Sequence, residues 1–241
     1  MAPTLVGGTE RLATAAAEAG VNRIVFGSSA FVYGGGHRPV VHDTPARPAL
    51  GYGRAKLDAE RTLERVAAGG GPVAASVRLP HVYGPQSLLF GLVRKGVVPF
   101  PGAGNNRFAQ LHVEDAARLL VASARSDWAG ALPAADHHGV TWKEFFEVLA
   151  SYAPRTRVVH LPAHGSQLVA RAGGSLLGHL GPTMISRDTV RGWNLELDVE
   201  SSALWDRLGL EPRFPSVLSG IPAVLDGVVA FRWRHPVSDR S

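Results

Sequence analysis

The 241-residue sequence contains no cysteine. It can therefore form no disulfide bond and offers no thiolate to a metal, and a cytoplasmic location is the expectation that fits this absence. It also has no run of about 18 apolar residues, so no membrane span is expected. Its first residues lack a basic segment followed by an apolar core, so no secretory signal is expected either.

Charged residues are scarce as well, at 19% of the chain, whereas hydrophobic residues make up 45%. This balance predicts a globular protein with a sizeable core rather than a disordered chain. The net charge is +5 and the pI is about 10.1. A basic chain raises the question of nucleic-acid binding, but no five basic residues are consecutive. We interpret the excess as scattered surface arginines and expect no nucleic-acid partner.

Three polar side chains stand where chemistry is expected. Residues 23–26 read as a strand that runs into a turn containing Ser29. Tyr52 opens a helix, and Lys56 lies four residues later, so both side chains rise from one helix face. A serine, a tyrosine and a lysine gathered at the carboxyl end of a strand suit proton transfer to or from a substrate hydroxyl or carbonyl group.

The remaining pattern predicts an α/β protein with a parallel sheet and a mainly helical C-terminal part. A helix over residues 9–19 is expected, with Thr9 as N-cap and a buried stripe of Leu12, Ala15, Ala16 and Ala19. Further strands are predicted at 73–79, 132–135 and 157–161, and further helices at 88–95, 142–152, 201–208 and 216–234. Residues 108–115 are expected to lead into another helix that ends at about 126. Thr141 and Glu144 form a capping box at the start of the helix over 142–152.

Three ordered motifs carry a family resemblance: S-S-A-F-V-Y-G at 28–34, Y-G-R-A-K at 52–56 and V-R-L-P-H-V-Y-G-P at 77–85. Together they resemble the extended short-chain dehydrogenase/reductase family, which includes NAD(P)-dependent sugar-nucleotide epimerases, dehydratases and related reductases. The resemblance implies a partial Rossmann-like fold and NAD or NADP as cofactor. By position it makes Ser29, Tyr52 and Lys56 the catalytic residues.

The same resemblance assigns binding roles and domains. It places Ser28, Tyr52, Lys56 and Pro80 at the cofactor, and Ser29, His81 and Arg107 at the substrate. Residues 1–80, with a return at about 107–136, would form the back half of the nucleotide-binding domain. Residues 81–106 and 137–241 would form the substrate-binding part. Sugar nucleotides, steroid-like alcohols and flavonoid-type ketones all remain open as substrates, and a homodimer is the candidate assembly.

The family's dinucleotide site begins with a strand, a G-x-x-G-x-x-G turn and a helix, and no such segment precedes Ser29. Neither Gly102-Ala103-Gly104 nor Gly34-Gly35-Gly36 opens an expected helix. The resemblance thus implies that about ninety residues of the family's nucleotide-binding half are absent from this chain. A start downstream of the real one, an edge covered by another chain and a poorly stable remnant are the alternatives. In each case we expect weak NAD(P) binding.

Other polar residues have simpler interpretations. His112 and Asp115 precede and open a helix, where Asp115 is expected to cap or orient the helix start. His137 and His138 are adjacent, so their side chains point apart, and no third ligand stands at metal-like spacing. No metal is expected. Two functions remain: an NAD(P)-dependent oxidoreductase, epimerase or dehydratase, or a non-catalytic remnant that binds a partner through an exposed sheet edge.

Overall fold

The computed structural model describes residues 2–36, 39–161 and 187–234. Its elements in chain order are α1 (Ala2–Glu18), β1 (Arg23–Ser29), the 3-10 helix η1 (Ala30–Tyr33), α2 (Gly51–Ala68), β2 (Val73–Leu79), β3 (His81–Tyr83), α3 (Leu88–Arg94), β4 (Val97–Pro101), β5 (Arg107–Phe108), β6 (Gln110–His112), α4 (Val113–Arg125), β7 (Gly130–Pro133), β8 (Val140–Thr141), α5 (Trp142–Tyr152), β9 (Arg157–Leu161), α7 (Arg187–Trp193), α8 (Ser202–Leu208) and α9 (Val217–Arg234). Parts of the expected substrate-binding region, at 162–186 and 235–241, lie outside the described residues.

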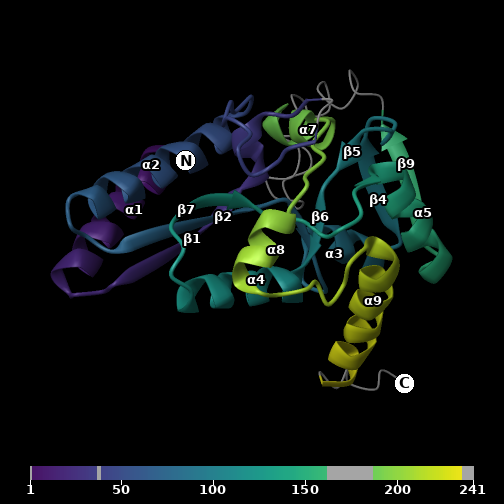
Figure 1. Cartoon of the computed structure of the whole chain (residues 1–241). Helices are drawn as coiled ribbons and strands as arrows, with labels where there is room; N and C mark the ends of the chain where they lie inside the picture. The colour runs from purple at the N-terminus through teal and green to yellow at the C-terminus, as the bar shows by residue number, and fades with distance from the viewer. Residues whose placement is uncertain (1, 37–38, 162–186, 235–241) are drawn as a thin grey trace.

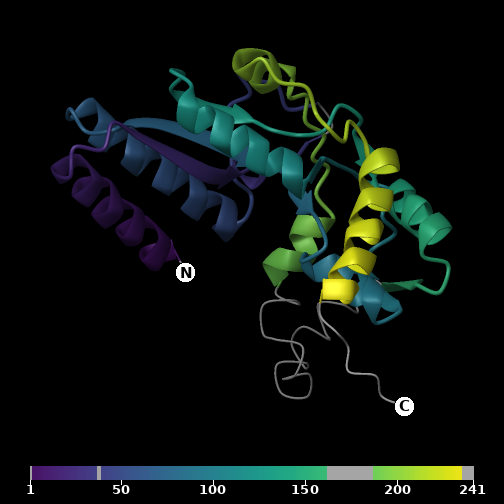
Figure 2. The same cartoon turned by 90° about the horizontal axis from the view of Figure 1, so that it is seen from below.

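A parallel sheet in the order β1-β2-β7 organises the first half of the chain. Strand β2 is buried along most of its length, as expected for a parallel strand covered on both faces. Helices α1 and α2 lie on one side of the sheet and α4 lies on the other (Figure 2). The predicted α/β class with a parallel sheet is therefore confirmed. Within the described part of the chain, β1 pairs only with β2 and forms an edge of the sheet.

The second part gathers at the opposite end of the molecule, where α5 and α9 lie with the parallel pair β4 and β9 (Figure 1). Aromatic residues are only 7% of the sequence, but many of them meet here around Trp142. The ring of Trp142 stacks on Trp193 at 5.5 Å and lies 5.2 Å from Phe108. Because Phe108 also contacts Phe31 of η1 at 5.8 Å, this core continues up to the end of the sheet.

The capping box is present as predicted. Thr141 Oγ1 accepts a hydrogen bond from the Glu144 amide at 3.1 Å, and Glu144 Oε2 accepts one from the Thr141 amide at 2.7 Å. The predicted start of the first helix at residue 9, with Thr9 as its N-cap, is wrong. α1 begins at Ala2, so Thr9 lies inside it and donates its hydroxyl to the Leu5 carbonyl at 2.8 Å.

The buried side of α1 also differs from the predicted stripe. Ala13 is fully buried in a cluster with Leu63 and Ala74, whereas Leu12 is 65% exposed. The helix is therefore rotated so that a small side chain meets α2. Among the described helices, none has the length and apolar character needed to cross a membrane.

Candidate functional site

The carboxyl end of β1 turns directly into η1, and Ser29 stands at this junction. Ser29 has extended backbone geometry and is the N-cap of η1, where its Oγ accepts a hydrogen bond from the Phe31 amide at 3.3 Å. A hydroxyl that accepts at its oxygen still has its own proton to donate. The turn ends at Gly34, whose φ of 79° is left-handed and favours glycine.

Helix α2 approaches this turn closely because its third residue is glycine. A Cβ on Gly53 would lie only 2.7 Å from the Phe31 carbonyl carbon, which is closer than real Cβ contacts. The ring of Tyr52 therefore lies edge-on to Phe31, with centroids 6.3 Å apart, and remains 38% exposed. One helical turn later, Lys56 Nζ donates a hydrogen bond to the Gly27 carbonyl at 2.7 Å.

These contacts bring Ser29, Tyr52 and Lys56 together around residues 27–31, as their spacing predicted. The Lys56 ammonium also lies 5.8 Å from the centre of the Tyr52 ring and 4.7 Å from that of Phe26. One of its three protons is held by the Gly27 carbonyl, so the others can be donated elsewhere.

Burial shifts the pKa values of Tyr52 and Lys56 in the directions that favour the neutral form of each side chain. It raises the pKa of the Tyr52 phenol above its ordinary value of 10.0. It lowers the pKa of the Lys56 ammonium, an effect that the negative charge of Glu60 partly offsets. At neutral pH the phenol is therefore protonated in the chain alone, and its use as a base requires further positive charge nearby.

Ser28 belongs to a different network from its neighbour Ser29. Its hydroxyl donates to Glu60 of α2, and the same carboxylate forms an ion pair with Arg78 of β2 at 2.7 Å. Arg78 Nη1 in turn donates to the Tyr33 hydroxyl at 3.0 Å. Burial raises the pKa of Tyr33, although the positive charge of Arg78 opposes the change. This network joins β1, η1, α2 and β2, and it includes the residue that precedes Ser29.

The sequence interpretation did not single out Glu60 or Arg78. The available signal was a glutamate four residues after Lys56, on the same helix face, together with an arginine in an otherwise apolar strand. Buried charges are paired in folded proteins, so these two residues could have been proposed as partners.

Pro80 and His81 follow β2 at the same end of the sheet, since Leu79 is in register with Ser29. His81 Nδ1 lies 2.6 Å from Gln110 Oε1, and its ring is 5.0 Å from that of Trp142. Burial lowers the pKa of His81, which favours the neutral imidazole at pH 7. His81 thus lies on a short strand against the aromatic core.

Arg107 lies on β5, where its side chain is occupied by protein contacts. Its Nε forms an ion pair with Asp198 at 3.0 Å, and its Nη2 donates to the Gly139 carbonyl at 2.6 Å. The side chain is still 47% exposed and borders a cavity of about 430 Å³ that Asp136 and His137 also line. An incoming anion would therefore compete with Asp198 for this guanidinium.

The expectation that Asp115 caps the start of α4 is wrong, because its carboxylate contacts a distant segment. Its fully buried carboxylate accepts hydrogen bonds from the amides of Arg213 and Phe214, at 3.0 and 2.8 Å. His112 is the N-cap of α4 and accepts from the Glu114 amide at 3.2 Å. Across residues 2–36, 39–161 and 187–234, no group of three or more acidic or histidine side chains could hold a metal ion.

Comparison with known proteins places this geometry in a family. A relative, the uncharacterized protein y4nL of Sinorhizobium fredii, is 37% identical over 154 residues, which are 59% of this chain and 43% of y4nL. The chain covers 54% of a second protein of that organism, y4nG. It thus spans about half the length of these relatives.

Two solved structures have the same fold. MoeE5 in complex with UDP-glucuronic acid and NAD matches with a TM-score of 0.75 at 24% identity, over 94% of this chain and 71% of that one. DesIV, a dTDP-glucose 4,6-dehydratase from Streptomyces venezuelae with NAD and TYD bound, matches with a TM-score of 0.75 at 19% identity, over 98% and 68%. The family model described as "NAD dependent epimerase/dehydratase family" matches residues 2–132. The chain therefore belongs to the NAD-dependent epimerase/dehydratase family.

Proposed function

We propose that this protein carries out NAD(P)-dependent proton and hydride chemistry at a hydroxyl-bearing carbon of a sugar nucleotide, as an epimerase, dehydratase or related oxidoreductase. The observation that carries the proposal is the gathering of Ser29, Tyr52 and Lys56 around residues 27–31 at the carboxyl end of the parallel sheet. Ligands of open α/β sheets bind at this end of the strands. The substrate class is suggested by the sugar nucleotides named with similar structures.

The three side chains divide the work as follows. Tyr52 Oη takes the proton from the substrate hydroxyl, or returns it to the carbonyl oxygen. Ser29 donates its hydroxyl proton to the same substrate oxygen, because its own oxygen already accepts from Phe31. Lys56 stabilises the phenolate. When bound, NAD(P) supplies the hydride acceptor and donor.

The strength of the Tyr52–Lys56 interaction indicates what else is needed. Lowering a phenol pKa from 10 to 7 requires about 4 kcal/mol. One positive charge 5.8 Å from the ring centre supplies about 3 kcal/mol at an effective dielectric constant of 20, and screening reduces this because both side chains are partly exposed. Tyr52 therefore becomes an effective base only when a second positive charge, such as an oxidised nicotinamide, lies nearby.

The residues present fit one half of a dinucleotide. The partly exposed Tyr52 side chain and the remaining protons of Lys56 suit the hydroxyls of a nicotinamide ribose, and Pro80 follows β2 at the same end of the sheet. Ser28, which also had a predicted cofactor role, would act indirectly through Glu60. For the pyrophosphate half, the sequence holds no G-x-x-G-x-x-G turn between a strand and a helix. NAD and NADP fit this half-site equally.

On the substrate side, Ser29 would be joined by His81 and Arg107. The neutral His81 ring is held by Gln110, so it would present one face or its second nitrogen rather than a charge. Arg107 would have to exchange Asp198 for a substrate phosphate. In the proposed division of the chain, residues 1–80 and about 107–136 carry the nucleotide side, and residues 81–106 and 137–241 carry the substrate side.

The test is turnover of UDP- and dTDP-sugars by the purified chain at millimolar NAD or NADP, followed by chromatography and mass spectrometry. Tyr52→Phe should lower the rate at least about 100-fold, the range expected for loss of a general acid–base group. Tyr152→Phe is the matched control, because Tyr152 is 55% exposed on α5. Equal turnover by the two variants would contradict the proposed role of Tyr52, and no turnover of any nucleotide sugar would contradict the proposed function.

The open edge of the sheet favours a second candidate, a non-catalytic module that binds a partner or a second copy of the chain along β1. Unpaired strand edges are sites for strand addition. If this is the function, the amides of residues 23–29 should become protected from hydrogen exchange as protein or partner concentration rises. A monomer whose sugar turnover depends on Tyr52 would exclude it.

A further inference from the structure

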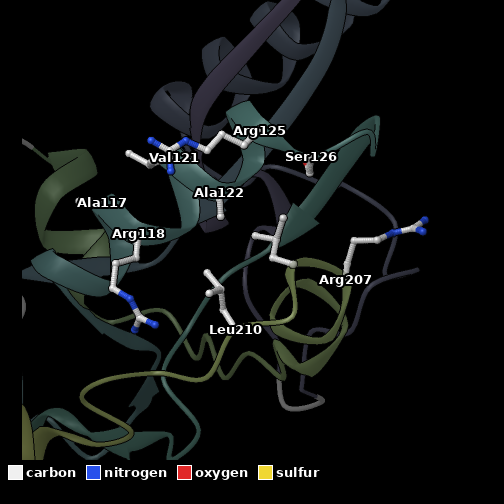
Figure 3. A pocket seen from close by; sticks show the side chains of 9 residues that line it. Ala117, Arg118, Val121, Ala122, Arg125, Ser126, Arg207 and Leu210 are labelled. Carbon is white, nitrogen blue, oxygen red and sulfur yellow. The ribbon is translucent and has the colours of Figure 1, made fainter.

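A groove of about 580 Å³ lies between α4 and α8 (Figure 3), and none of its lining residues comes from the turn around Ser29. Its lining residues come from one side of α4, from the end of α8 and from the segment that follows: Ala117, Arg118, Val121, Ala122, Arg125, Ser126, Arg207, Leu208 and Leu210. The groove is open to solvent, and Val121 within it is 52% exposed. An exposed apolar surface bordered by polar groups is typical of interaction sites.

Charge of one sign surrounds this apolar floor. Three of the nine lining residues are arginines and none is acidic. Arg118 is fixed in place, because its Nη1 pairs with the buried Asp115 at 2.6 Å and donates to the Glu211 carbonyl at 2.9 Å. With the other described residues, Arg125 and Arg207 form no side-chain hydrogen bond or ion pair at ordinary distances.

The placement of the arginines argues for an extended occupant. Arg118 and Arg125 are seven residues apart on α4, which puts them two helical turns or about 10 Å apart along the axis. Arg207 borders the groove from α8, and the three side chains point in different directions around the rim (Figure 3). A single phosphate or carboxylate cannot contact all three. A chain with acidic groups on both sides of an apolar stretch can, and its apolar side chains would meet Ala122 and Leu210.

We propose that the groove between α4 and α8 binds a polypeptide segment of a partner protein, with apolar side chains on the floor and acidic side chains against Arg118, Arg125 and Arg207. An amphipathic helix is the simplest form of such a segment, since it presents apolar residues on one face and acidic residues beside them. The proposal is independent of the sugar-nucleotide chemistry, because it uses none of the residues around Ser29.

Selection from a random 16-residue peptide library displayed on phage tests this without presuming a sequence. The full chain should enrich peptides that combine acidic and large apolar residues. A fluorescein-labelled peptide from that pool should bind in an anisotropy titration, more weakly at higher salt. The double variant Arg125→Gln/Arg207→Gln should bind it at least about 10-fold more weakly. Val121→Glu, which places a negative charge on the floor, should act in the same direction.

Two variants serve as matched controls. Arg11→Gln/Arg65→Gln removes the same charge from exposed positions on α1 and α2, and Leu218→Glu changes a residue on α9 that is 66% exposed. Both should bind like the original chain. The proposal is overturned if no acidic and apolar consensus emerges, or if the groove variants bind as well as the controls. It is also overturned if an acidic peptide without apolar residues, or an oligonucleotide, competes equally, because either result indicates unspecific attraction of anions.

Discussion

At the scale of single residues, one buried carboxylate connects the elements that surround the proposed proton-transfer site. Glu60 is 1% exposed and contacts Ser28 and Arg78, and Arg78 contacts Tyr33. These contacts join residues 18 to 45 positions apart, so the spacing of a short sequence motif does not predict them. Helical periodicity predicts which face of α2 is buried, but it does not tell which charged residue on that face is paired.

Glu60→Gln should therefore destabilise the fold. The substitution leaves the buried Arg78 guanidinium without a counter-charge, which costs roughly 3–5 kcal/mol of stability. The free energy of unfolding from urea titration measures the effect. Asp58→Asn on the same helix is the control, because its pair with Arg61 is long, at 3.8 Å, and largely exposed, so a loss below about 1 kcal/mol is expected. Similar losses in the two variants would mean that the buried pair is not held as described.

Asp136 is a second buried acid, but it has no counter-charge. It is 2% exposed, and neither carboxyl oxygen has a hydrogen-bond partner at ordinary distance among the described residues. Burial raises the pKa of Asp136 to about 8, while the nearby His138 amide lowers it by less. The carboxyl is therefore protonated in the folded protein at pH 7 and ionised in the unfolded chain.

This difference makes stability depend on pH in a defined direction. Between about pH 4, the ordinary value for an aspartic acid, and about pH 8, the folded state binds one proton more than the unfolded state. The free energy of unfolding should then fall as the pH rises through this window, by up to about 1.4 kcal/mol per pH unit. Asp136→Asn should remove this part of the slope and be the more stable protein at pH 8.

Urea titrations at about pH 5, 6, 7 and 8 give the free energy of unfolding across this window, and hence its slope against pH for each variant. Asp206→Asn, at an exposed position on α8, should keep the slope of the original chain. If Asp136→Asn also keeps that slope, the carboxyl is already ionised in the folded protein, and its surroundings must be more polar than the contacts indicate.

At the scale of elements, the approach of α2 to η1 depends on the absence of a side chain at Gly53. The Cβ of an alanine there would meet the backbone of Phe31, which cannot turn away as a long side chain can. The position of Tyr52 and Lys56 relative to Ser29 is thus set by a contact between backbones. Gly53, the second residue of the motif Y-G-R-A-K, therefore has a packing function.

Gly53→Ala should separate the two elements and cost about 1–3 kcal/mol of stability, although alanine is the better helix former. It should also displace Tyr52 and lower any turnover that depends on this residue. Gly91→Ala in α3 is the matched control, because its Cβ would meet only the mobile end of Arg94 at 3.7 Å. This control should be neutral or more stable by up to about 1 kcal/mol. A stabilised Gly53→Ala protein would refute the close contact.

Comparison of two helix starts shows what local sequence can predict. The start of α5 was predictable, because Thr141 and Glu144 satisfy each other's backbone groups within four residues. The phase of α1 was not, because Ala13 is buried against Leu63 and Ala74, which are distant in sequence. Hydrophobicity alone favoured Leu12, which is exposed. Predictions therefore succeeded where the deciding contacts were local and failed where tertiary packing decided.

At the scale of the whole molecule, the predicted sheet edge and the predicted residue cluster are both present. The motif spacing predicted that Ser29, Tyr52 and Lys56 lie near one another, because the topology of a parallel α/β fold brings the end of a strand close to the start of a neighbouring helix. It could not locate the partners of Arg107, since Asp198 comes from a segment about ninety residues away.

The affinity for NAD follows from which of its contacts the chain can supply. Micromolar binding requires about 8 kcal/mol. Hydrogen bonds from Lys56 and Tyr52 to a ribose contribute about 1–3 kcal/mol each, and ordering the ligand offsets part of this gain. The remaining affinity of such sites comes from backbone amides of a glycine-rich turn at a helix N-terminus, and the sequence contains no such turn.

We therefore expect the 241-residue chain to bind NAD and NADP more weakly than micromolar, with no saturation in a calorimetric titration over that range. Lys56→Met should weaken the residual binding further, as seen by loss of ligand-induced shifts in the NMR spectrum at millimolar NAD. Lys143→Met, an exposed change on α5, should leave those shifts unchanged. Micromolar affinity in calorimetry would mean that another part of the chain holds the pyrophosphate. The glycine-containing segments at 34–36 and 102–104 would then be the first places to substitute.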